Sequence, residues 1–105
     1  MSTVVSIQLD HVETLAAELA ALARSLSDDV ALCTSSATRL RACLAGDEGW
    51  HAGAAATGWA GLLELLRSRA EAVASTLGAA AESYRAVDGA LRERIAASPW
   101  VAAAR

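Results

Sequence analysis

The chain has 105 residues, a net charge of −3 and a pI near 5.2. This acidic balance argues against a nucleic-acid-binding protein, which would need a basic surface to displace counterions. Alanine occupies 27 positions, Phe, Lys and Asn are absent, and the single proline is Pro99. Such a composition is typical of helices, and the length allows one all-α domain with only a modest core. Association with another chain is therefore plausible from the start.

The sequence contains no predicted membrane-spanning segment. No uninterrupted apolar run reaches the roughly 18 residues that would cross a bilayer. The longest neutral stretch, 49–63, is interrupted by His51 and by glycines. The first ten residues lack a basic region ahead of an apolar core, so no secretory signal peptide is expected. If the protein is exported, we expect another route.

A first amphipathic helix is predicted over about residues 10–45, because apolar positions recur at steps of three and four. They are Val12, Leu15, Leu19, Leu22, Leu26, Val30, Cys33, Ala37, Leu40 and Leu44. Asp10 and Glu13 have the spacing of a capping box, which places the helix start near Asp10. Gly46 readily adopts the left-handed conformation at a helix end, so a turn is expected over about 46–50.

A second helix of matching length is predicted over about residues 51–97, again from apolar steps of three and four. Its apolar positions are Trp59, Leu62, Leu66, Ala70, Val73, Leu77, Ala80, Tyr84, Val87, Leu91 and Ile95. Pro99 disfavours helical conformation at Ser98, so a frayed tail is expected over 98–105. The short turn requires the helices to lie antiparallel, as a hairpin roughly 50 Å long.

More apolar residues are present than the facing sides of two helices require. Leu32, Leu63 and Leu65 lie outside the main stripes and are predicted to contact a partner. Burial of a leucine stabilises by roughly 1.5–3 kcal/mol, so covering a few of them would be decisive for a small fold. We therefore expect two hairpins to pair into a four-helix bundle.

The two cysteines are predicted to remain free of one another. Cys33 and Cys43 are ten residues apart on one helix, so their Cα atoms would be roughly 15 Å apart, too far for a disulfide. Cys33 falls on the apolar stripe and is expected in the core, as free cysteines often are. Cys43 lies off the stripe, where it is either an inert thiol or a link between chains.

No catalytic, cofactor or metal site is predicted. The only histidines are His11 and His51, and the sequence has neither a Cys/His ligand spacing nor a Glu-x-x-His pair. It also lacks a serine elbow and a phosphate-binding loop. We therefore do not expect an enzyme.

Two groups of aromatic residues are not fully explained by helix periodicity. Trp50 and Gly53 fall near the predicted turn, where Trp50 is expected to plug the end of the hairpin. Tyr84 and Asp88 lie one turn apart on the second helix. An alternative interpretation places Tyr84 in the core and pairs Asp88 with Arg92 at the next i,i+4 step.

These features together resemble the Trp-x-Gly (WXG) family of small proteins exported by type VII secretion systems. The resemblance covers nearly the whole chain: about 100 residues, two long helices, a Trp/Gly turn and a late Tyr-x-x-x-Asp/Glu. Trp50 and Gly53 match the turn, and Tyr84 and Asp88 match the secretion signal. The turn departs from the family pattern by one extra residue, and the literal spacing Trp59-Ala60-Gly61 falls within a predicted helix.

The resemblance implies a bacterial protein that is exported folded, as a homodimer or heterodimer with a related hairpin, without a cleaved signal peptide. It also implies recognition of Tyr84 and Asp88 by the membrane-bound machinery and its ATPase, and a location outside the cell or at its surface after export from the cytoplasm. The alternative function is a cytoplasmic chaperone or adaptor for a larger secreted protein, in which Tyr84 serves only as core.

Overall fold

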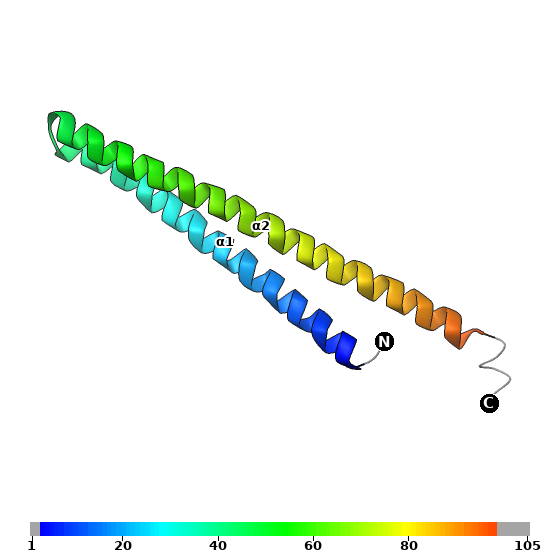
Figure 1. Ribbon diagram of the computed structural model, residues 1–105. Helices are drawn as coiled ribbons and strands as arrows, with labels where there is room; N and C mark the ends of the chain where they lie inside the picture. Colours follow the sequence, from blue (N-terminus) through cyan, green and yellow to red (C-terminus); the bar gives the residue numbers. More distant parts are fainter. Residues whose placement is uncertain (1–2, 99–105) are drawn as a thin grey trace.

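The computed structural model describes residues 3–98 and consists of two long α-helices, α1 (Thr3–Cys43) and α2 (Gly46–Ala96). The helices run antiparallel and lie side by side, as Figure 1 shows. No strand is present over residues 3–98. The predicted all-α helical hairpin is confirmed.

The first helix begins at Thr3, seven residues before the start that the capping box predicts. Asp10 and Glu13 accept hydrogen bonds from a residue of the other helix instead of capping their own. The Arg85 guanidinium donates to Asp10 Oδ1 at 2.5 Å and to Glu13 Oε1 at 2.7 Å. The acidic pair therefore joins α1 to α2.

The turn is shorter than expected and consists of Leu44 and Ala45. Gly46 supplies the left-handed conformation with φ +67°, the one positive φ in the described chain. Close packing at this turn also requires Gly49. A Cβ added there would lie 2.1 Å from the Leu44 carbonyl oxygen, and such an approach is open only to glycine.

Small side chains fill the contact between the helices. The buried apolar residues are Leu9, Ala16, Ala23 and Ala37 of α1 and Ala60, Ala74 and Ala81 of α2. They recur at multiples of seven residues, which is the repeat that keeps one side of a helix against its neighbour. We call these seven residues the alanine seam. Gly53 lies buried one repeat before Ala60.

Most large apolar residues lie beside the alanine seam, which corrects the predicted core. The exposed members of the predicted stripes are Leu15 and Leu22 of α1, Leu44 of the turn, and Trp59, Leu62, Leu66, Val73, Ala80, Tyr84, Val87, Leu91 and Ile95 of α2. Apart from Leu9, every buried apolar side chain on this line of closest contact is an alanine, and the larger side chains turn to the sides. Leu19, Leu26, Cys33 and Leu77 are half-buried at its edge.

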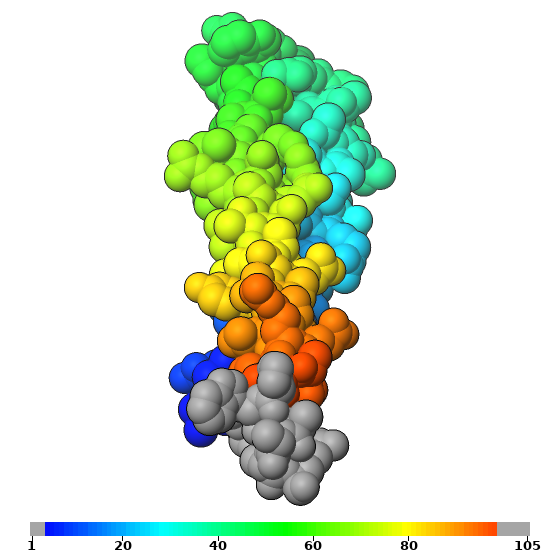
Figure 2. Space-filling model, turned by 90° about the vertical axis from the view of Figure 1, so that its right-hand side faces the viewer, coloured from blue at the N-terminus to red at the C-terminus, as the bar shows by residue number. Residues whose placement is uncertain are grey.

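The hairpin is a single layer of two helices that measures 86 × 16 × 13 Å. Figure 2 shows α2 along the length of this narrow body with α1 beside it. The predicted length of roughly 50 Å was too short, because α1 has 41 residues and α2 has 51 and each rises about 1.5 Å per residue. Within the described chain, each helix has only one neighbouring helix.

Candidate helix-docking face

Polar contacts between the helices gather on one side of the alanine seam. Arg85 joins Asp10 and Glu13 near the open end of the hairpin, which is the end opposite the turn. Nearer the turn, Arg41 Nη2 donates to the Thr57 hydroxyl at 3.4 Å. Residues on this side of the hairpin therefore have partners within the chain.

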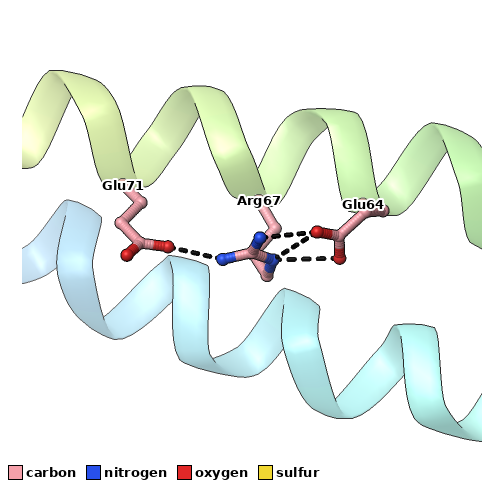
Figure 3. Close-up of polar contacts among 3 residues, drawn as sticks. All are labelled: Glu64, Arg67 and Glu71. Carbon is pink, nitrogen blue, oxygen red and sulfur yellow. Dashed lines mark hydrogen bonds and ion pairs between the residues drawn. The ribbon is translucent and has the colours of Figure 1, made fainter.

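Arg67 is a polar member of the α2 column that otherwise forms the alanine seam, since it lies seven residues from both Ala60 and Ala74. Its guanidinium donates to Glu64 at 2.5–3.0 Å and also to Glu71, and Figure 3 shows it between the two carboxylates. The hydrogen bonds from Arg67 lower the pKa of Glu64, and those that Glu64 accepts raise the pKa of Arg67. The positive charge of Arg67 is thus compensated by carboxylates of the same helix.

The opposite side of the seam is apolar and hollowed by two grooves. The larger, of about 450 Å³, lies at mid-length between the helices and is lined by Leu19, Leu22, Leu26, Leu66, Arg69, Ala70 and Val73. The smaller, of about 240 Å³, lies towards the open end and is lined by Val5, Gln8, Leu9, Val12 and Tyr84. Six of these seven residues in the first groove, and four of five in the second, are apolar or aromatic.

We call this side the apolar face. It comprises Val5, Val12, Leu15, Leu19, Leu22 and Leu26 of α1 and Leu63, Leu66, Ala70, Val73, Leu77, Tyr84 and Val87 of α2. In each helix these residues form two columns beside the seam, and each column repeats every seven residues. In a four-helix bundle, apolar columns in this position contact the other pair of helices. Leu22, Leu66 and Val73 are 45–50% exposed, so the chain itself does not cover them.

Trp50 does not plug the end of the hairpin, contrary to the prediction. It lies on the first turns of α2, is 63% exposed, and meets the His51 ring edge to face with 5.5 Å between ring centroids. Gly53 is buried because the Arg41 side chain crosses it: an added Cβ would lie 2.6 Å from Arg41 Cγ. Both residues belong to α2, since the turn ends at Ala45.

Tyr84 and Asp88 occupy neighbouring surface near the open end, but in different environments. Tyr84 is 67% exposed and lines the smaller groove, so its predicted alternative role in the core is wrong. Asp88 is half-buried, and Arg92 Nε lies 3.1 Å from its Oδ2. The i,i+4 pairing proposed by that alternative is therefore confirmed.

The three predicted partner-contact leucines do not form one surface. Leu63 is half-buried on the apolar face, whereas Leu32 and Leu65 are exposed. Each of these two lies five residues from a seam alanine, Ala37 or Ala60, which turns it about 140° away from the seam. The seven-residue columns are the sequence signal that would have identified the apolar face.

The two cysteines and the possible metal ligands do not form a site in the described part of the chain. Cys33 is half-buried, Cys43 is exposed, and both are free thiols. Over residues 3–98, no group of three or more His, Cys, Asp and Glu side chains is arranged to hold a metal ion. In the same range, neither helix has the length and apolarity needed to cross a bilayer.

Comparisons with protein-family models, with curated proteins and with solved structures found no match to this chain.

Proposed function

We propose that this protein is a type VII secretion substrate, or the co-secreted partner of one, that acts by binding a related helical hairpin and not by catalysis. The apolar face is the observation that carries this proposal. Each large apolar side chain moved from water into an interface contributes roughly 1.5–3 kcal/mol. A protein with so small an internal core gains much of its stability from such a partner.

The dimensions of the face suit a pair of helices. It runs roughly 36 Å along the hairpin, since 24 residue steps of about 1.5 Å separate Leu63 from Val87, and the hairpin is 16 Å wide. Its columns repeat every seven residues along both helices. A second hairpin with the same repeat would complete a four-helix bundle with the two grooves filled.

Export would depend on Tyr84 and Asp88, the residues that match the family's secretion signal. In the hairpin alone, Tyr84 is 67% exposed and lines the smaller groove. Arg85, between them in sequence, ties this part of α2 to α1 through Asp10 and Glu13. In this proposal the secretion machinery and its ATPase recognise the signal on a folded hairpin.

The test compares Asp88→Asn with the matched change Asp28→Asn, at an exposed aspartate of α1. Loss of the Asp88–Arg92 pair should cost only about 0.3–0.5 kcal/mol, so both variants should fold and keep their partner. We expect release of Asp88→Asn into the medium to fall sharply, dependent on the secretion ATPase, while Asp28→Asn is released normally.

Equal release of both variants at matched expression would refute the secretion signal. Absence of the unmodified protein from the medium, with retention on a larger secreted protein in the cytoplasm, would favour the chaperone or adaptor function. Circular dichroism and co-purification of the partner establish that any loss of release does not come from unfolding.

A further inference from the structure

A line of apolar side chains on α2 points away from α1 and lies outside the apolar face. Leu62 and Leu65 are 45% and 50% exposed. They lie two and five residues from Ala60, which turns them about 160° and 140° away from the alanine seam. A partner on the apolar face would therefore leave both leucines uncovered. Trp59 is 58% exposed and lies seven residues before Leu66, so it marks the border between the two surfaces.

Two glycines beside these leucines open a hole in this surface. In knobs-into-holes packing, four residues at i, i+3, i+4 and i+7 surround one inserted side chain, and these positions are here occupied by Gly58, Gly61, Leu62 and Leu65. An added Cβ at either glycine meets no atom within 4 Å, so the space above both is open. One turn nearer the start of α2, the same spacing recurs at Ala55, Gly58, Trp59 and Leu62. We call these six residues the outer strip.

The extent of the outer strip suits one short helix better than a second hairpin. Its length from Ala55 to Leu65 is about 15 Å, since ten residue steps of about 1.5 Å separate them. A helix about 10 Å across would cover a footprint of roughly 150 Å² there, far below the roughly 800 Å² per partner of a standard interface. About three turns of helix would therefore cover the whole strip, whereas a second hairpin would extend well beyond it.

Charges mark both ends of the outer strip. Glu48 and Arg69 lie at seven-residue steps from Ala55 and Leu62, one at each end of the same column. Both are exposed, and no ion pair joins either of them to another residue of the described chain; Arg69 also borders the larger groove. A helix with apolar residues at its centre and charged residues at its ends complements this pattern. A lipid surface would favour several basic residues along the strip, and Arg69 is alone there.

We propose that the outer strip binds one short amphipathic helix of another protein, whose large apolar side chains insert above Gly58 and Gly61. This contact goes beyond the pairing of hairpins, because the strip lies on a different side of α2 from the apolar face. The small area predicts a weak and readily reversed contact, as in transient recognition.

The test adds a labelled synthetic helix to the purified full chain. The probe has about 18 residues, enough to form a helix, with leucines at steps of three and four and one glutamate and one arginine at its ends. We expect the backbone amide signals of Gly58 and Gly61 to shift in NMR spectra as the probe is added. The signals of Gly78 and Gly89, further along α2, should keep their positions.

Filling the hole separates docking from folding. Gly61→Leu extends a side chain into open space, so the midpoint of urea denaturation should not fall. The same change should raise the dissociation constant of the probe about tenfold or more, measured by fluorescence anisotropy. Ala79→Leu is the matched control, because Ala79 is exposed and lies five helical turns further along the same side of α2. Its affinity for the probe should be unchanged.

Equal affinity of the probe for Gly61→Leu and Ala79→Leu would overturn the proposal, as would shifts confined to the apolar face at Leu22 and Val73. If phosphatidylglycerol vesicles shift Gly58 and Gly61 and the peptide does not, the strip binds lipid and the proposal is wrong. An oligomer of the unmodified chain that Gly61→Leu abolishes would assign the strip to a second copy. None of these results depends on release into the medium, so a failure here is distinguishable from a failure of the proposed function.

Discussion

The close approach at Gly49 predicts opposite effects for one substitution at two positions of the same helix. An added Cβ at Gly49 would lie 2.1 Å from the carbonyl oxygen of Leu44 and 2.9 Å from its carbonyl carbon. Backbone atoms cannot yield as a flexible side chain does, so the turn must shift by close to an ångström. At Gly61, an added Cβ meets no atom within 4 Å.

The magnitudes follow from these surroundings. Overpacking costs about 1–3 kcal/mol, and alanine recovers about 0.5–1 kcal/mol of helix propensity over glycine. We therefore expect Gly49→Ala to lower the free energy of unfolding by about 1–2 kcal/mol. Gly61→Ala should raise it by about 0.5–1 kcal/mol, because only the propensity changes.

Urea denaturation followed by circular dichroism at 222 nm measures both changes at one protein concentration. The two midpoints should move in opposite directions with little change in the denaturant slope. If Gly49→Ala is as stable as Gly61→Ala, the turn is not packed as closely as described and the role assigned to Gly49 is refuted.

Three other predictions concern the seam, Trp50 and the Arg67 cluster. Ala81 is 1% exposed, so Ala81→Leu should cost about 1–3 kcal/mol by denaturation, whereas Ala80→Leu, at its exposed neighbour, should not separate the helices. Trp50→Ala should change the stability of the hairpin by less than about 1 kcal/mol, because Trp50 is 63% exposed; a larger loss by denaturation would indicate that Trp50 is covered. Carboxyl NMR titration should give Glu64 a pKa below its usual 4.5, and Arg67→Gln should return that pKa to its usual value. The stabilisation from the Glu64–Arg67 pair should therefore persist above pH 4.5 and decline as the pH falls below it.

The architecture could be predicted from the sequence because the apolar steps of three and four and Gly46 are local signals. The facing sides of the helices were harder to predict. Large apolar residues dominate a periodicity pattern, since their burial contributes most, yet at a close helix contact size excludes them. The alanines at positions 16, 23 and 37, and at 60, 74 and 81, are spaced at multiples of seven residues. Because the chain has 27 alanines, this spacing does not stand out in the sequence.

Contacts between residues far apart in the sequence account for the other differences between the predicted and the observed structure. Asp10 and Glu13 have the spacing of a local cap, and only the folded hairpin brings Arg85 to them. Trp50 was expected to be buried because a tryptophan gains most from burial, but a two-residue turn leaves no end cavity for it. Tyr84 was predicted both as an exposed signal and as core, and its environment depends on how α1 packs beside it.

The two-residue turn at Leu44 and Ala45 also bears on the order in which the hairpin forms. Contacts near the turn close loops of only a few residues, whereas Arg85 and Asp10 are separated by 75 positions along the chain. Closing a longer loop costs more conformational entropy before any contact compensates for it. Pairing should therefore start at the turn and advance towards the open end, where Tyr84 lies. Amide hydrogens near Tyr84 would then exchange with solvent sooner than those near Ala60, and a partner would slow exchange most at the end that closes last.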